Sequence, residues 1–273
     1  MPAMNSIRFA LNHMCAPSLS LESFFSAAGR LGIDSVEIRN DLAGNAILDG
    51  TPAATVKELA ARYGLTIISI NALQRFNEWN EVRAKEAAEL IGFARDCGAK
   101  ALVLVPVNDG SGREPEARKQ HLVTALTALK PMLDAAGIIG LVEPLGFEIC
   151  SLRSKTEAAA VIEELGAQST FRLVHDTFHH HLAGETAIFP ELTGLVHISG
   201  VSDPAVSVFD MRDPHRVLVD ANDRLDNAGQ MRALLSAGYA GPFSFEPFAP
   251  DVHALKEPVE ALKESMAYLT AQV

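Results

Sequence analysis

Residues 57–73, KELAARYGLTIISINAL, decide the fold. Charged and apolar residues alternate at helical spacing as far as Tyr63, and Gly64 follows them. The apolar, β-branched run TIISI then occupies 66–70. Because glycine adopts the positive φ that ends a helix, this order predicts a helix that returns the chain to the start of the next strand.

The same order of helix, glycine and strand recurs along the chain. Apolar runs that predict strands occupy 7–11, 35–38, 66–70, 101–105, 138–143, 171–176, 195–199 and 243–246. Segments with amphipathic helical spacing lie at about 20–31, 52–63, 79–97, 115–136, 155–165, 185–192, 228–237 and 253–271. Alternating strands and helices form a parallel sheet. We therefore predict an α/β fold, a single (β/α)8 barrel domain over residues 1–273.

The composition fits a globular enzyme and excludes several other classes. Apolar residues make up 48% of the chain, enough to fill a large core. A net charge of −11 without a basic tract argues against nucleic-acid binding, which needs clustered Lys and Arg. No segment has the roughly 20 apolar residues of a membrane span, and no signal peptide is evident. Three widely spaced cysteines indicate a reducing compartment, so we expect a cytoplasmic protein.

Polar residues stand where the predicted strands end, and the strand ends of such barrels form the active site. Four successive strands, from the fifth to the eighth, supply Glu143, Asp176, His197 and Glu246. Three carboxylates and an imidazole suit Mn²⁺, Zn²⁺, Co²⁺ or Mg²⁺, and a cation would offset the repulsion among the acids. We therefore predict one divalent metal ion here. The alternative is that each acid pairs with an arginine or caps a helix.

The stretch DTFHHH at 176–181 adds three consecutive histidines. Adjacent side chains cannot all point at one ion, so we place only His179 at the site and expect His180 and His181 to pack or to lie at the surface. Strand residues alternate in direction, so His175 should face the helices. The longest irregular stretch, 200–227, is expected to be either functional or disordered.

These residues resemble the xylose-isomerase-like barrels, and most closely the inosose (2-keto-myo-inositol) isomerases of inositol catabolism. The similar stretches cover nearly the whole chain and include INALQRFNEWNE (70–81), VEPLGFEIC (142–150), HDTFHHHLAG (175–184) and FSFEPF (243–248). Relatives usually carry an acidic residue after the histidine of the seventh strand and a G-x-G after the loop arginine. This chain has Ser199-Gly200 and Asp220-Ala221-Asn222 in those places, which leaves the choice of substrate open.

The resemblance implies metal ligation by the same four strand-end residues. It also implies substrate contacts by His179, Arg216, Asn71, Glu37 and Arg39. The implied enzyme is a metal-dependent sugar or polyol isomerase or epimerase that acts through a metal-stabilised enediolate on an inosose or a related keto-polyol. We expect Glu143 and Glu246 to be the catalytic proton donor and acceptor. Barrels of this type often pair, which leaves a homodimer as one expected assembly.

Three other readings stay open at this point. A dehydratase of a cyclic keto-polyol could use the same site to expel a β-hydroxyl. A sugar-binding barrel without catalysis would keep the pocket and lose the chemistry. An endonuclease for abasic DNA is disfavoured by the acidic surface and by the small number of histidines near the site.

Overall fold

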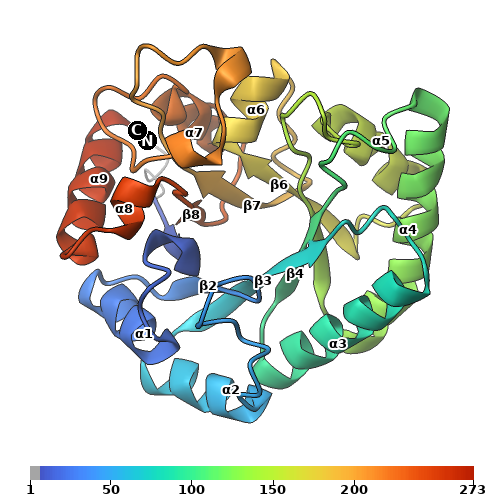
Figure 1. Ribbon diagram of the computed structural model, residues 1–273, viewed down its shortest axis with the longest axis horizontal. Coiled ribbons are helices and arrows are strands. Elements are labelled where there is room, and N and C mark those ends of the chain that lie inside the picture. Colours follow the sequence, from blue (N-terminus) through green and yellow to red (C-terminus); the bar gives the residue numbers. More distant parts are fainter. Residues whose placement is uncertain (1–6) are drawn as a thin grey trace.

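The structure is a computed structural model that describes residues 7–273, so what was expected of residues 1–6 lies outside the described part of the chain. Eight parallel strands close into a barrel in chain order (Figure 1). They are β1 (Phe9–Asn12), β2 (Ser35–Arg39), β3 (Thr66–Gln74), β4 (Ala101–Val105), β5 (Ile139–Val142), β6 (Phe171–Asp176), β7 (Thr193–Ile198) and β8 (Phe243–Phe245). Because β8 pairs with β1, the sheet has no open edge, and the predicted fold class is confirmed.

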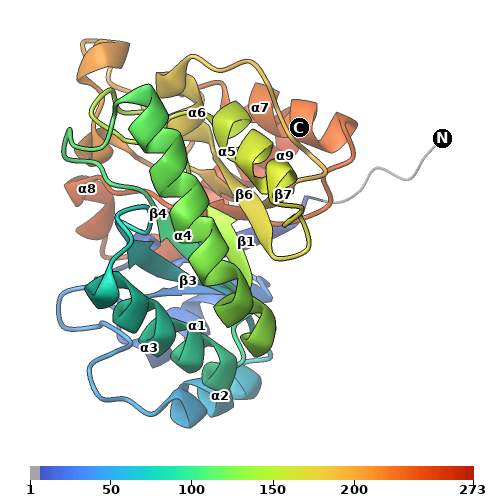
Figure 2. The same ribbon diagram turned by 90° about the vertical axis from the view of Figure 1, so that its right-hand side faces the viewer.

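Helices surround the barrel, and Figure 2 shows α3, α4 and α5 along its outer face. The helices are α1 (Leu21–Arg30), α2 (Ala53–Arg62), α3 (Glu81–Cys97), α4 (Pro115–Ala136), α5 (Lys155–Glu164), α6 (Thr177–Ala183), α7 (Asn227–Ser236), α8 (Pro250–His253) and α9 (Pro258–Gln272). Side chains of Ser20, Asn80 and Ser154 accept hydrogen bonds from backbone N–H groups in the first turns of α1, α3 and α5. Gly98 and Gly137 end α3 and α4 with φ of 82° and 66°.

One predicted helix is wrong. The range 185–192 is not helical, and α6 instead follows β6 directly. The Asp176 side chain accepts a hydrogen bond from His179 N at 2.9 Å, which caps the helix at its start, and Gly184 ends it with φ of 66°. The run of three histidines therefore lies on a helix. The last predicted helix is also interrupted, since α8 and α9 each begin with a proline.

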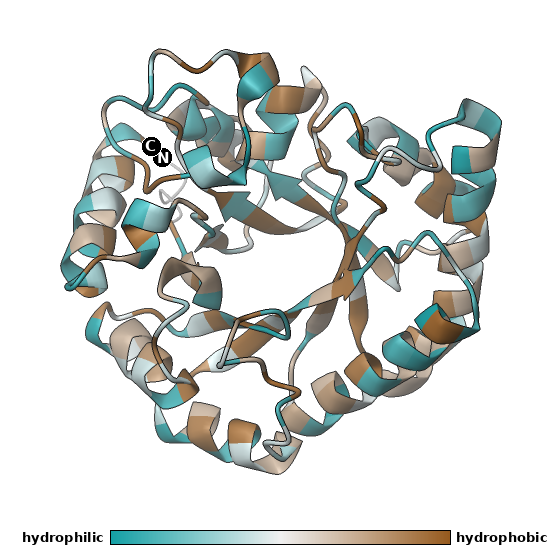
Figure 3. Cartoon of the chain, in the orientation of Figure 1, coloured by the Kyte–Doolittle hydropathy of each residue, from teal (hydrophilic) through white to brown (hydrophobic). Residues whose placement is uncertain are grey.

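Alternation along the strands separates two apolar layers. In β4, Leu102 and Leu104 pack against the helices, whereas Ala101 and Val103 belong to a small cluster inside the barrel. Figure 3 shows the apolar character of β3 and β4 and the mixed faces of the helices around them. Toward the carboxyl ends of the strands the inward residues become polar. The barrel therefore has an apolar floor and a polar mouth.

The 199–226 loop, which joins β7 to α7, packs on an apolar cluster that it shares with α6 and with the segment after β5. It contains the short 3-10 helices η2 (Val208–Asp210) and η3 (Asp213–His215), and a backbone bridge joins Gly200 to Val217. Beneath the loop lies a hydrophobic cluster that is separate from the main core and consists of Leu145, Phe147, Cys150, Phe178, Val201, Met211 and Leu225. The loop is therefore ordered, which favours the functional alternative stated above.

No helix within residues 7–273 has the length and apolar character needed to cross a membrane.

Candidate metal centre

Four buried side chains meet at the carboxyl end of the barrel. Glu143 and Glu246 directly follow β5 and β8, Asp176 ends β6, and His197 lies in β7 beside Asp176 in register. Backbone hydrogen bonds hold both glutamates, from Glu143 N to Leu104 O at 3.1 Å and from Glu246 N to Ile198 O at 2.9 Å. One donor atom from each of the four lies within 4.8 Å of the others. The strand geometry thus brings together the four residues that the sequence singled out.

The donor set fits a divalent cation. His197 Nδ1 lies 2.9 Å from Glu143 Oε1, 3.3 Å from Glu246 Oε2 and 4.0 Å from Asp176 Oδ2. Ligands of a zinc-like ion lie about 2.0–2.2 Å from it, so donors of one ion are at most about 4.4 Å apart. The three distances from His197 Nδ1 lie within that limit, and the four donor atoms together lie within 4.8 Å of one another, slightly beyond it. These four residues could hold a metal ion.

Glu37 lies on the opposite side of the His197 ring. Its carboxylate accepts the Nε2–H of His197 at 3.1 Å and also accepts hydrogen bonds from Ser69, Ser244 and Asn71 at 2.5, 2.5 and 2.7 Å. Burial alone would raise the pKa of Glu37, but the His197 charge and these hydrogen bonds lower it to about 2. The ionised carboxylate fixes Nε2 and turns Nδ1 toward the three acids. Glu37, which was expected to contact substrate, is fully buried and contacts the candidate ligand His197.

Two buried arginines reach the same cluster. Arg216 Nη2 donates to Asp176 Oδ2 at 2.6 Å and to Glu246 Oε2 at 3.1 Å. Arg39 Nη1 donates to Glu246 Oε1 at 2.7 Å, while its Nε and Nη2 pair with both oxygens of Asp41. Ion pairs of this kind were the alternative explanation for the strand-end acids. Here they coexist with the cluster and hold the carboxylates in place.

The pKa shifts follow from this crowding. Burial raises the pKa of Glu143, and the nearby charges of Glu246 and Asp176 add to the effect against the opposing charge of His197. Burial would lower the pKa of His197, but the charges of Glu246, Glu37 and Glu143 raise it well above its usual value. Burial would raise the pKa of Asp176, but the Arg216 charge lowers it below its usual range. The cluster is a buried site that attracts positive charge.

A cavity of about 320 Å³ opens above the cluster. Glu143 and Glu246 line it, together with four of the expected substrate contacts, Asn71, Arg39, His179 and Arg216. His179 is buried, and its Nδ1 has no hydrogen-bond partner among the described residues. A buried ring nitrogen in a cavity wall is suited to an oxygen of a bound molecule.

The other histidines of the region point away from the centre. His175 accepts a hydrogen bond from Lys155 Nζ at 3.1 Å and donates from Nε2 to Gln230 Oε1 at 2.9 Å, so it faces α5 and α7 as predicted. His180 Nδ1 lies 2.5 Å from the same lysine nitrogen, which places it in packing between helices. Only His179 of the three consecutive histidines lines the cavity.

Several residues of the centre were missed from the sequence. Asn12 donates from Nδ2 to Glu246 Oε1 at 3.2 Å and accepts from Arg39 Nη1 at 3.1 Å. The Phe248 ring lies 4.5 Å from the Arg216 guanidinium carbon and 5.5 Å from that of Arg39. Asn12 ends β1, so the inspection of strand ends could have found it, and Phe248 lies two residues beyond Glu246. Ser69 and Ser244 give no such signal.

A closed parallel barrel that presents three buried carboxylates and an imidazole at its mouth defines a class of (β/α)8 proteins with a group of candidate metal ligands at one rim. Residues 25–272 match the family described as the xylose isomerase-like TIM barrel, and the chain belongs to this family. A comparison with curated proteins gave no match.

Solved structures agree with this assignment. A xylose isomerase domain containing protein from Salmonella typhimurium LT2 is 36% identical, with a TM-score of 0.89 over 98% of this chain and 99% of that one. The IolI protein with a bound zinc atom is 20% identical, with a TM-score of 0.87 over 97% and 98%. An L-ribulose 3-epimerase is 18% identical, with a TM-score of 0.71 over 97% and 94%. The last two likenesses show the fold.

Proposed function

We propose that this protein is a divalent-metal-dependent isomerase or epimerase of a keto-polyol, with an inosose as the first substrate to test. The observation that carries the proposal is that Glu143 and Glu246 belong to the four-donor cluster and also line the cavity above it. A substrate in that cavity meets two carboxylates from strands that are separated by β6 and β7. Such a pair is suited to moving a proton between neighbouring atoms.

Glu143, Asp176, His197 and Glu246 would hold the ion, which we expect to be Mn²⁺, Zn²⁺, Co²⁺ or Mg²⁺. When bound, it would supply Lewis-acid stabilisation of negative charge on the substrate oxygens. The zinc atom in the related IolI structure supports the choice of a zinc-like ion.

The protein side chains have distinct tasks in this proposal. One glutamate of the pair removes a proton from the carbon beside the carbonyl, and the other returns a proton to the neighbouring position; such catalysis contributes about 10²–10⁴-fold. Arg39 and Asn12 hold Glu246 Oε1, while Oε2 faces His197 and accepts from Arg216 Nη2. His179 Nδ1 binds a substrate oxygen, and the Arg216 guanidinium in the cavity wall orients a hydroxyl group.

The test is a proton-exchange screen of inososes and ketohexoses in D₂O with added Mn²⁺, Co²⁺ or Zn²⁺. The substrate proton beside the carbonyl should exchange with solvent, and Glu246→Gln should lower the rate by at least about 10²-fold because the amide cannot accept that proton. Glu22→Gln, at an exposed glutamate on α1, is the matched control and should exchange like the wild type. Undiminished exchange in Glu246→Gln would remove this residue from the proposed proton transfer.

Product analysis by NMR separates isomerisation from dehydration. An isomerase or epimerase conserves the mass of the substrate. A dehydratase instead gives olefinic or deoxy signals and a loss of water, and that result would replace the proposal. Binding without exchange or product would favour the non-catalytic barrel.

A further inference from the structure

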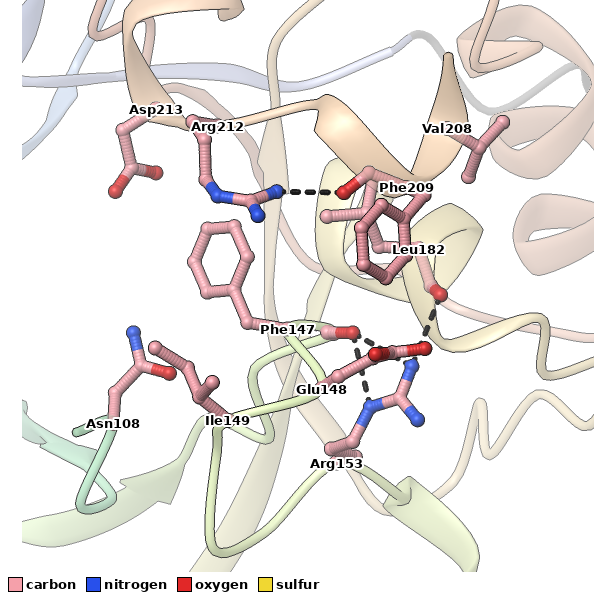
Figure 4. A pocket seen from close by; sticks show the side chains of 11 residues that line it. Asn108, Phe147, Glu148, Ile149, Arg153, Leu182, Val208, Phe209, Arg212 and Asp213 are labelled. Carbon is pink, nitrogen blue, oxygen red and sulfur yellow. Dashed lines mark hydrogen bonds between the residues drawn. The ribbon is translucent and has the colours of Figure 1, made fainter. Parts of the chain in front are cut away.

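A second cavity, of about 390 Å³, adjoins the first at the mouth of the barrel (Figure 4). Asn108, Phe147 and Asp213 line both cavities, so the two are continuous along one wall. Ligand pockets typically have volumes of about 300–1,000 Å³, so each cavity alone has room for a small chemical group. The candidate metal centre lies beneath only the first.

The two cavities differ in chemistry. Charged and amide side chains dominate the first, whereas the second has an apolar wall. That wall consists of Phe147, Ile149, Leu182, Val208 and Phe209, and the polar side chains of Asn108, Glu148, Arg153, Arg212 and Asp213 complete the lining. Phe209 is 65% exposed, Ile149 49% and Val208 42%, which makes them three of the most exposed large apolar residues described. Apolar side chains gathered around a hollow mark a binding site more often than scattered ones do.

Local hydrogen bonds hold this wall in place. The Ser207 hydroxyl accepts from Asp210 N at 3.2 Å and caps η2, which carries Val208 and Phe209. Arg212 Nη1 donates to Phe209 O at 2.8 Å, as Figure 4 shows, and its guanidinium carbon lies 5.8 Å from the centre of the Phe147 ring. These bonds fix the short segment that presents the exposed Val208 and Phe209 side chains to the cavity.

A polar atom marks the boundary between the two cavities. Asn108 Oδ1 is buried and has no hydrogen-bond partner among the described residues, although its residue lines both cavities. A buried amide oxygen without a partner costs free energy unless a bound molecule donates to it. A hydroxyl group beside the link between a polar and an apolar part of a ligand would meet this need.

We propose that the second cavity is a subsite for an aryl or alkyl group attached to the keto-polyol. This inference rests on the proposed function and narrows its substrate class to polyols with an apolar substituent, such as the aryl glycoside of a keto-sugar. The polyol part occupies the first cavity, and the substituent packs between Phe147, Ile149 and Phe209.

The test compares ligands that differ only in the substituent. Calorimetry with the Zn²⁺-loaded protein measures the affinity for phenyl and methyl β-D-glucosides, which need no turnover. We expect the phenyl compound to bind at least about 10-fold more tightly, as is usual for added apolar groups in an apolar pocket. Phe209→Ser and Ile149→Ser should abolish this preference, and both positions are exposed, so folding is not at risk. Val82→Ser, at a 65% exposed apolar position on α3, is the matched control.

The outcomes separate this inference from the proposed function. Equal affinities for the two glucosides, no binding of either, or a preference that survives in Phe209→Ser and Ile149→Ser would overturn the subsite. If these variants instead convert a dimer to a monomer in sedimentation, the surface binds a second copy and the subsite is also overturned. A phenyl preference without any proton exchange on keto-polyols would leave the subsite standing and refute the proposed isomerase.

Discussion

Glu37 orients the imidazole ring of His197, and both oxygens of the Glu37 carboxylate make contacts. Oε1 accepts from Ser244 and His197, and Oε2 accepts from Ser69, Asn71 and His197. A carboxylate can satisfy all of these donors because it only accepts. An amide at this position would point an NH₂ group at other donors.

Glu37→Gln should therefore weaken Zn²⁺ or Mn²⁺ binding by about 10–100-fold, the usual effect of losing the partner of a metal-binding histidine. Calorimetric titration of the metal-free protein measures this change. Glu22→Gln, whose side chain is 56% exposed, serves as the control with the same loss of charge. Unchanged affinity in Glu37→Gln would mean that His197 needs no such partner.

His13 makes the stability depend on pH. It is fully buried, stacks on Phe24 with 4.3 Å between ring centres, and donates from Nε2 to Leu19 O at 3.0 Å. Burial, with a smaller effect from the Arg39 charge, outweighs the hydrogen bond to Leu19 and lowers its pKa to about 4. The unfolded chain therefore takes up this proton first as the pH falls. The stabilisation is complete above pH 6.5 and is lost progressively as the pH falls to about 4.

The lowered pKa of His13 corresponds to a loss of up to about 3 kcal/mol in the free energy of unfolding as the pH falls from 6.5 to about 4. Urea denaturation at a series of pH values measures it. His13→Phe keeps a ring against Phe24 and should flatten the pH dependence, even though it loses the bond to Leu19. A His13→Phe curve parallel to that of the wild type would assign the acid sensitivity to other groups.

The sequence predicts candidate residues better than it predicts their neighbours. Glu143, Asp176, His197 and Glu246 could be found because each lies at the end of a strand, where the side chains of a barrel converge. Arg216 came from the family resemblance alone, since nothing in the long loop indicates which residue reaches the centre. The contacts of Ser69 and Ser244 with Glu37 depend on the distances between strands. No local pattern in the sequence contains these distances.

At the scale of elements, α6 is held against the segment after β5 by a close contact at a glycine. A Cβ atom at Gly146 would lie 2.3 Å from His179 O and 2.6 Å from Leu182 Cβ. The absence of a side chain therefore allows α6 to approach, and this approach places His179 in the cavity wall.

Gly146→Ala should push α6 outward and destabilise the protein by about 1–3 kcal/mol, as overpacking does. It should also weaken substrate binding because His179 moves with the helix. Thermal denaturation and the Michaelis constant of the exchange reaction measure the two effects. Gly92→Ala is the matched control, because a Cβ at this position in α3 meets no atom within 4 Å and alanine favours helix. A normal Michaelis constant in Gly146→Ala would separate α6 from binding.

The elements themselves follow from local patterns, except for the sixth and the last predicted helices. All eight strands lie where apolar runs predicted them. The sixth helix was expected at 185–192, but α6 begins at Thr177, directly after its cap residue Asp176. Asp176 both caps α6 and belongs to the candidate metal-ligand cluster, so the helix-capping alternative holds for this residue beside the metal hypothesis.

For the whole molecule, the buried acids predict a strong link between metal binding and stability. Three carboxylates share one buried cluster in a chain of net charge −11. Zn²⁺ at 100 times its dissociation constant should stabilise the fold by about 2.7 kcal/mol and raise the melting temperature by about 5–10 °C. Differential scanning calorimetry with the ion, and then with a chelator, measures the gain and its reversal. An equal gain in the Glu143→Gln, Asp176→Asn double variant would show that the ion binds elsewhere.

The 199–226 loop carries Arg216 into the centre and Phe209 to the rim, and it packs both on the apolar cluster beneath it and, through Val219, in the main core. A loop grafted from a relative would therefore have to preserve an apolar side chain at position 219, which packs in the main core. Such a graft would vary the side chain at position 209 while the four candidate metal ligands, none of which lies in the loop, stay in place.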